Sequence, residues 1–241
     1  MDKKEIKKFL QKVWYFIWES NSIWSWIVNI ILAFVIIKFL VYPGLGLVLG
    51  TSHPIVAVVS GSMEHRITPV CTEFKEQKFL FTEYKRCLNY NYSLCGNIYP
   101  RKQRVDYNFY WNECGNWYSS NVNITKAEFE KFIFRNGFNK GDIIVLKGKP
   151  PEKINVGDVI VFRNKRPDPI IHRVVKKWKF NGKYYFQTKG DHNSDSTKTN
   201  ILDEKNISQD DVIGRASLRI PYLGWIKIAF VGFLRLIGIV R

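Results

Sequence analysis

Residues 54–65 read PIVAVVSGSMEH, and the interpretation of the whole chain depends on this stretch. Its first half is apolar and rich in β-branched side chains, which favours a buried strand. Ser60 and Ser62 follow, with one glycine between them. A strand can hold a serine hydroxyl rigidly while the next turn exposes it. A Ser-Gly-Ser turn is also an ordinary way to end a strand. The stretch therefore predicts a nucleophile only if the chain supplies a base.

The segment before this stretch, residues 23–42, is apolar and has tryptophans near its start. A helix needs roughly 20 such residues to cross a bilayer, and tryptophans gather at the interface. We expect Pro43 and Gly44 to end this helix. The apolar core is too long for a cleaved signal peptide, and a buried core helix is the alternative. Lysines among residues 1–8 predict a cytoplasmic N-terminus and an extracytoplasmic remainder.

The chain of 241 residues carries 37 Lys and Arg against 21 Asp and Glu, a net charge of +16. Such a charge fits a nucleic acid, a membrane surface, or no partner at all. Aromatic residues make up 15% of the chain, and many lie in apolar runs near the N-terminus. This placement favours a membrane over a nucleic-acid groove.

All four cysteines lie in a polar stretch, residues 66–139, that we interpret as an inserted subdomain. Their spacings lack the close pairs of a zinc ribbon, so no metal is expected. Outside the cytoplasm, two disulfides with three possible connectivities are the expected state, and free thiols are the main alternative. The cysteines are Cys71, Cys87, Cys95 and Cys114.

A β pattern resumes after this stretch. Residues 143–146 and 159–162 are short β-branched runs that each follow a Gly-Asp turn. Asn181-Gly182, between two further β-rich runs, predicts a tight hairpin. Counted outward from this turn, the register places His172 opposite Asp191, unless a β-bulge shifts the pair.

The last segment of the chain is apolar and carries a few basic residues, which predicts a helix in the membrane interface or a short second span. The expected division of the chain is residues 1–45 for the cytoplasmic N-terminus and transmembrane helix, 46–65 and 140–220 for a catalytic β domain, 66–139 for the extracytoplasmic insert, and 221–241 for the C-terminal membrane-associated segment.

Five motifs occur in chain order: SGSME at 60–64, GDVI at 157–160, IHRVV at 171–175, TKGD at 188–191 and IPYLGW at 220–225. Together they resemble the type I signal peptidases of the archaeal and endoplasmic-reticulum branch. The bacterial relatives carry a lysine base where this sequence has a histidine. The resemblance covers residues 24–64 and 140–225 and leaves out the cysteine-bearing insert.

The resemblance implies a mostly β catalytic domain in which Ser62 is the nucleophile and His172 the general base. Ser60 would help to form the oxyanion hole. The family's second aspartate follows its Gly-Asp motif at a longer spacing than Asp195 does here. We expect Asp195 to orient His172, with Asp191 as the alternative from the hairpin register.

A further departure is His65, which stands where the family usually has proline and is a rival base. The implied activity is that of a membrane-bound serine endopeptidase without a cofactor, which removes signal peptides from translocated pre-proteins after small residues. The substrate would add as an extended strand to a sheet edge. The expected substrate contacts are Val59, Gly61, Met63, Ile143 and Val145.

The implied location is the cell or endoplasmic-reticulum membrane, with the catalytic domain outside the cytoplasm. The expected partners are signal peptides and the lipid bilayer, with the translocation machinery as a further candidate and no nucleic acid. Two other functions fit parts of this sequence. A catalytically inactive, membrane-anchored binding relative would lack part of the triad. A membrane-tethered nucleic-acid binder would show steeply salt-dependent binding, but the basic residues are spread along the chain.

Overall fold

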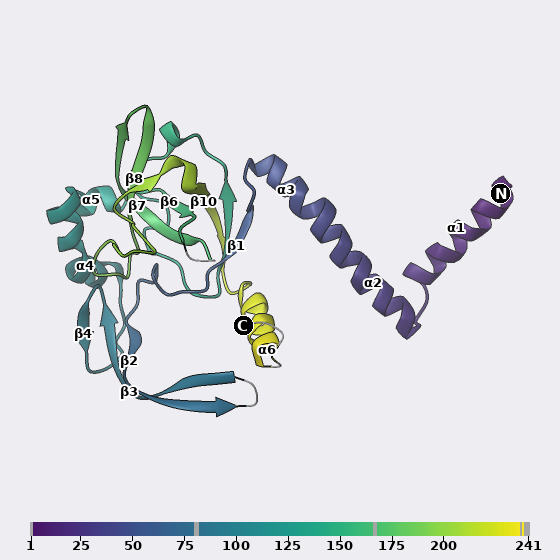
Figure 1. The fold of residues 1–241 in the computed structure, drawn as a ribbon, viewed down its shortest axis with the longest axis horizontal. Helices are drawn as coiled ribbons and strands as arrows, with labels where there is room; N and C mark the ends of the chain where they lie inside the picture. The colour runs from purple at the N-terminus through teal and green to yellow at the C-terminus, as the bar shows by residue number, and fades with distance from the viewer. Residues whose placement is uncertain (1, 80–81, 166–167, 237, 239–241) are drawn as a thin grey trace. The chain divides into compact units, whose positions relative to one another are not determined.

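The computed structural model describes residues 2–79, 82–165, 168–236 and 238 (Figure 1). The chain divides into two compact units, Met1–Ser52 and His53–Arg241. This division falls a few residues after the boundary expected from the sequence, and each unit is described by itself.

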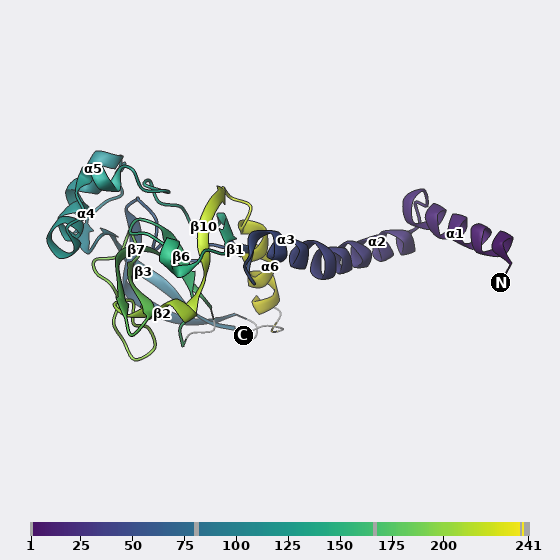
Figure 2. The ribbon, with the colours of Figure 1, turned by 90° about the horizontal axis from the view of Figure 1, so that it is seen from above.

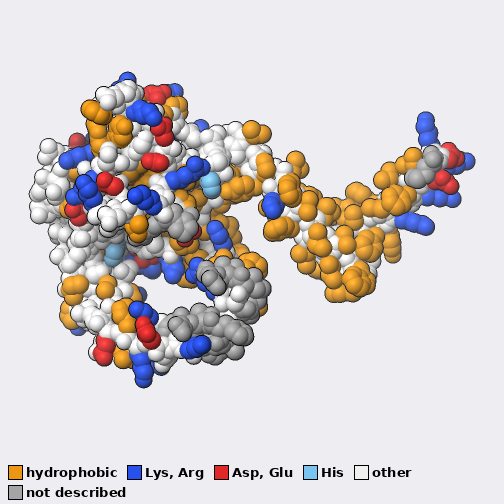
Figure 3. All heavy atoms as spheres, in the orientation of Figure 1, with side chains coloured by type: hydrophobic (Ala, Val, Ile, Leu, Met, Phe, Trp, Pro, Cys, Tyr) orange, Lys and Arg blue, Asp and Glu red, His pale blue; other side chains and the backbone are white. Residues whose placement is uncertain are grey.

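The first unit is helical. Helix α1 (Lys3–Trp18) is followed by α2 (Ile23–Ile36), a π-helical turn η1 (Ile37–Val41) and α3 (Tyr42–Leu49). The last three elements form one continuous helix, Ile23–Leu49, which is long and apolar enough to cross a membrane by length and composition. Hydrophobic side chains cover this helix in the space-filling view (Figure 3).

The expectation that Pro43 and Gly44 end this helix is wrong. Pro43 lies in the first turn of α3, directly after the π-helical turn. A π-helical turn changes the hydrogen-bond spacing, so a proline without an N–H can be accommodated there. The helix ends instead at Gly50, whose φ of 64° is the left-handed conformation that favours glycine at a helix C-terminus.

The second unit contains one large antiparallel sheet, which confirms the mostly β fold. Among the described residues it has seven strands. In spatial order they are β1 (Ile55–Ala57), β5 (Ile143–Lys147), β10 (Val212–Ile220), β6 (Val159–Phe162), β7 (Ile170–Phe180), β8 (Lys183–Lys189) and β9 (Ile207–Ser208). Short 3₁₀ turns, η2 (Pro151–Lys153) and η3 (Gln209–Asp211), join some of these strands.

The cysteine-bearing insert forms a second sheet and two helices. The sheet contains β2 (Thr68–Phe79), β3 (Thr82–Leu94) and β4 (Asn97–Tyr99). The helices are α4 (Tyr107–Val122) and α5 (Lys126–Phe129). Two disulfides are present, as expected, and they join Cys71 to Cys87 and Cys95 to Cys114.

The insert shares a hydrophobic core with the main sheet. Val175 of β7 packs in the same buried cluster as Tyr110, Cys114 and Tyr118 of α4. Figures 1 and 2 both show α4 beside β7. The insert is therefore joined to the main sheet through a continuous core, and not by linkers alone.

The chain's last described helix is α6 (Trp225–Leu236). Its start is held by the approach of Trp225 to Gly141, where a Cβ atom would lie 2.0 Å from the indole Nε1. Several of its apolar side chains are exposed, among them Ile226, Phe230 and Phe233. An exposed apolar face on a helix with basic residues fits an interfacial position.

Candidate active site

Ser62 and His172 meet although 110 residues separate them. Ser62 lies in the turn that follows β1, where the Glu64 N–H donates to the Gly61 carbonyl at 3.0 Å. His172 lies on β7 and is 5% exposed. Its Nε2 is 2.8 Å from the Ser62 hydroxyl. This is the hydrogen bond through which a histidine can activate a serine.

The other ring nitrogen of His172 contacts a residue that the sequence did not single out. Nδ1 forms a short hydrogen bond with Oε1 of Glu204, which is fully buried. Thr188 Oγ1 donates to the same carboxylate oxygen at 3.0 Å, and the Thr197 N–H donates to Oε2 at 2.8 Å. Glu204 is thus fixed in place by donors on both of its oxygens.

The electrostatics of Glu204 determine the tautomer of His172. Burial by itself would raise the pKa of Glu204, but the hydrogen bond and charge of His172, with the Thr197 amide, outweigh it and lower that pKa. An ionised carboxylate can only accept hydrogen bonds. Nδ1 of His172 therefore carries the proton, and Nε2 presents its lone pair to the Ser62 hydroxyl.

Asp195, the expected orienter, does not contact His172. Its side chain is 54% exposed and lies at the surface, where it accepts from Lys205 Nζ at 3.2 Å and from Trp117 Nε1 at 3.0 Å. The loop after β8 delivers Glu204 to the histidine instead.

Asp191, the alternative orienter, does not reach His172 either. The Asn181-Gly182 turn forms as expected, with φ of 46° and 79°. A bulge between Val174 and Lys176 then shifts the register by one residue, so that Arg173 pairs with Lys189. Side chains alternate between the two faces of a strand, so this shift removes His172 from the position opposite Asp191.

Asp191 is instead the centre of a buried ionic network. Arg173 donates to both of its carboxylate oxygens, at 2.9 and 2.6 Å, and His65 Nε2 lies 2.9 Å from Oδ2. Burial would raise the pKa of Asp191, but the charge of Arg173 and the bond with His65 hold it well below its usual range. Burial lowers the pKa of His65 in spite of Asp191. His65 thus binds Asp191, and within the described part of the chain no hydrogen bond joins its side chain to Ser62.

Gly190 brings the loop after β8 against both reacting residues. A Cβ atom at this position would lie 2.8 Å from His172 Nε2 and 2.8 Å from the Ser62 carbonyl oxygen. Only a residue without a side chain permits this approach.

Of the remaining expected residues, four are close to Ser62 in the sequence, and Ile143 and Val145 lie on β5, which pairs with β1. Ser60 Oγ is 3.2 Å from Ser62 Oγ, and Val59 is 55% exposed beside it. Met63 is 1% exposed and packs in a core cluster, so its side chain cannot face a substrate. Gly61, Ile143 and Val145 are half-buried.

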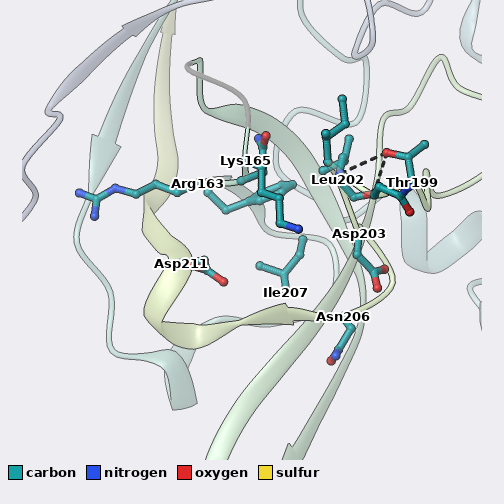
Figure 4. Close-up of a pocket in the computed structure, with 12 residues that line it drawn as sticks. Arg163, Lys165, Thr199, Leu202, Asp203, Asn206, Ile207 and Asp211 are labelled. Atoms are coloured by element: carbon teal, nitrogen blue, oxygen red, sulfur yellow. Dashed lines mark hydrogen bonds between the residues drawn. The ribbon is translucent and has the colours of Figure 1, made fainter.

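A cavity of about 140 Å³ lies beside the loop that carries Glu204 (Figure 4). Thr199 and Leu202 shape its wall through mutual hydrogen bonds, such as that from the Thr199 N–H to the Leu202 carbonyl at 2.7 Å. The reacting residues do not line this cavity, so it is separate from the site. Within the described ranges no group of three His, Cys, Asp or Glu side chains could hold a metal ion.

Comparison with known proteins identifies similar sequences. The chain is 30% identical over 216 residues to the signal peptidase complex catalytic subunit SEC11 of Pyricularia oryzae, an alignment that covers 84% of each protein. It is 36% identical over 94 residues to the human signal peptidase complex catalytic subunit SEC11C, which covers 38% of this chain and 49% of that protein. The Sclerotinia sclerotiorum subunit sec11 is 30% identical over 117 residues, 43% of this chain and 68% of that protein. No family model matches the chain.

Proposed function

The chain belongs to the type I signal peptidase family, and we propose that it removes signal peptides through Ser62, His172 and Glu204. The observation that supports this assignment is the 2.8 Å contact between Ser62 Oγ and His172 Nε2, with Glu204 on the far side of the ring. Glutamate serves in place of aspartate in this arrangement in other serine hydrolases.

In the proposed mechanism His172 Nε2 takes the Ser62 proton as Oγ attacks the scissile carbonyl. Glu204 accepts the Nδ1–H throughout and stabilises the imidazolium that forms. The Ser62 backbone N–H, with the Ser60 hydroxyl, stabilises the oxyanion. His172 then protonates the leaving amine, and water, activated by the same base, releases the acyl group from Ser62.

The substrate would bind along β1. This strand is at the edge of the main sheet, and among the described residues no strand pairs with its outer side. An extended peptide can add to such an edge through its main chain. Val59 and Gly61 lie between this edge and Ser62, and they would favour small substrate side chains near the cleaved bond. Ile143 and Val145 on β5 are further proposed contacts, whereas the buried Met63 supports the site from within.

The helix Ile23–Leu49 would anchor the enzyme in the membrane. Lysines in α1 favour a cytoplasmic N-terminus, which leaves the catalytic unit outside the cytoplasm, where signal peptides emerge. The exposed apolar face of α6 would lie in the bilayer interface. The relatives are subunits of a complex, so the translocation machinery is a candidate partner.

The test is cleavage of a pre-protein by the detergent-solubilised chain, beside a Ser62→Ala variant. We expect cleavage after a small residue by the unsubstituted protein and none by the variant. The variant should keep its melting temperature, because Ser62 is half-buried and the substitution removes one oxygen. Equal turnover by a folded Ser62→Ala variant would exclude this mechanism. Absence of cleavage by both folded proteins would favour the inactive binding relative.

A further inference from the structure

Residues 190–192 clamp the turn that carries the nucleophile. The His192 N–H donates to the Ser62 carbonyl at 2.9 Å, and His192 Nδ1 lies 3.2 Å from the Glu64 carbonyl. The Asp191 N–H points to Met63 Sδ at 3.4 Å. These contacts hold the Ser62 and Glu64 carbonyls and the Met63 side chain, from the nucleophile onward along the turn.

Residues of the insert form hydrogen bonds with this clamp, the segment 190–192. The Cys95 N–H donates to the His192 carbonyl at 3.0 Å. Tyr110 of α4 donates its hydroxyl proton to the Asp191 carbonyl at 3.0 Å, and Tyr118 donates to Asp191 Oδ1 at 3.1 Å. The donors in all of these contacts belong to the insert, residues 66–139.

One disulfide connects these donors. Cys114 lies between Tyr110 and Tyr118 on α4, four residues from each, so all three share one helix face. They are at most 1% exposed. The bond from Cys114 to Cys95 therefore fixes the end of β3 to the same face that contacts Asp191.

We propose that α4 and the Cys95–Cys114 disulfide position the catalytic serine through residues 190–192. The expected effect on kcat rests on the proposed function. Tyr110, Tyr118 and the two cysteines are positioning residues, because they touch the clamp and not the reacting atoms. Displacement of a catalytic group by about 1 Å can lower a rate by about 100-fold.

The second disulfide is a matched control. Cys71 and Cys87 join β2 to β3 within the hairpin, and their sulfur atoms lie near the Glu73 and Asn89 carbonyls of the same hairpin. Its loop is of similar length, with a sequence separation of 16 against 19 for Cys95–Cys114. Removal of either bond therefore releases a similar constraint on the unfolded chain.

The experiment compares Cys95→Ser/Cys114→Ser with Cys71→Ser/Cys87→Ser in the full chain in detergent. We expect the first double variant to lose about 10- to 100-fold in kcat with KM within about twofold, because the substrate edge at β1 is not part of the clamp. The control should keep kcat within about twofold. Equal kcat values for the two folded variants would overturn the proposal.

A second pair of variants, each with one conservative substitution, is used if the first double variant does not fold. Tyr118→Phe removes only the hydroxyl that binds Asp191, and Tyr99→Phe removes one that binds Glu113 elsewhere in the insert. Tyr118→Phe should lower kcat several-fold without changing KM, and Tyr99→Phe should not. A normal kcat for Tyr118→Phe would then contradict the proposal.

Amide hydrogen exchange separates this inference from the proposed function. The His192 N–H, which donates to Ser62, should exchange faster in the positioning variants than in the controls. If the unsubstituted chain shows no Ser62-dependent cleavage, the proposed function fails, and faster exchange alone still supports the clamp. Unchanged exchange at residues 190–192 would reject the clamp even in an active enzyme.

Discussion

Among single residues, Glu204 accepts hydrogen bonds on both of its carboxylate oxygens. Its substitution is the sharpest test of the proposed triad. Glu204→Gln keeps the size of the side chain but replaces the ionised oxygen that fixes the His172 tautomer. We expect kcat to fall by about 10⁴-fold, as for loss of the triad carboxylate in a serine protease. Turnover of a pre-protein by the folded variant is the measurement.

Asp195→Asn is the matched control for this substitution. Asp195 is exposed and contacts Lys205 and Trp117, so its loss should leave kcat within a few-fold. Exposed ion pairs of this kind contribute about 1 kcal/mol or less to stability. An inactive Asp195→Asn enzyme, with an active Glu204→Gln enzyme, would show that Asp195 and not Glu204 orients His172.

Gly190 offers a second test at this scale, based on space and not on charge. In Gly190→Ala the new methyl group would clash with both His172 Nε2 and the Ser62 carbonyl. We expect the Ser62–His172 contact to open and cleavage to fall at least 100-fold, since a 1 Å displacement has about that effect. Cleavage and circular dichroism should be measured together. Full activity in this variant would show that the loop relaxes without disturbing the site.

Ser62 and His172 could be identified from the sequence because each lies in a motif that resembles the signal peptidases, SGSME and IHRVV. Glu204 could not, because it lies in an irregular loop. Nothing in the residue pattern distinguishes it from its neighbour Asp203, and only the fold decides which carboxylate turns inward. His65 was a rival base by proximity in sequence, but its ring stacks on Tyr110 and binds Asp191.

At the scale of elements, strand β8 ends in a buried lysine whose titration is predicted to affect stability. Lys189 is fully buried between the rings of Trp117 and Tyr118. Burial lowers its pKa to about 8, against the opposing charges of Asp191 and Glu204. An unfolded lysine has a pKa of about 10.4, so between about pH 8 and 10 the unfolded chain binds more protons.

The free energy of unfolding should therefore rise with pH across this window, by up to about 1.4 kcal/mol per unit of pKa difference. The midpoint of urea unfolding, measured at several pH values from 7.5 to about 9.5, reports this rise. Lys189→Met should remove the slope. A slope that persists in the variant would assign the titration to another group.

The β7–β8 hairpin was predicted correctly at its turn and incorrectly at its base. Its turn chemistry fixed the Phe180–Lys183 pair correctly. The bulge near Val175 has no marker in the sequence, and it places Arg173 and not His172 within reach of Asp191. The continuation of the apolar helix Ile23–Leu49 through Pro43 was not predicted, for a similar reason. The π-helical turn that accommodates Pro43 has no distinctive amino-acid composition.

At the scale of the whole molecule, the disulfides and the membrane helix predict one topology. With the catalytic unit outside the cytoplasm, impermeant thiol reagents should label the cysteines on intact membranes only after reduction. Mass spectrometry of the labelled peptides is the measurement. Labelling of all four cysteines without a reductant would contradict the presence of the disulfides. Labelling only after the membrane is permeabilised would show that the catalytic unit lies in the cytoplasm.

The overall plan of an apolar anchor, a β catalytic unit and a cysteine-bearing insert was predictable because each part has its own composition. The role of the insert was not, because it depends on three-dimensional contacts. Tyr110 and Tyr118 are ordinary aromatic residues in the sequence, and only packing of α4 against β7 directs both hydroxyls to Asp191.

The connectivity of the two disulfides also has a consequence for biogenesis. The first cysteine is bonded to the second and the third to the fourth, so the two covalent loops follow one another without overlap. When the polypeptide is threaded through the membrane from its N-terminal end, Cys71 and Cys87 emerge first and can be oxidised before Cys95 appears. In the proposed topology, the order of arrival therefore favours the native pairing.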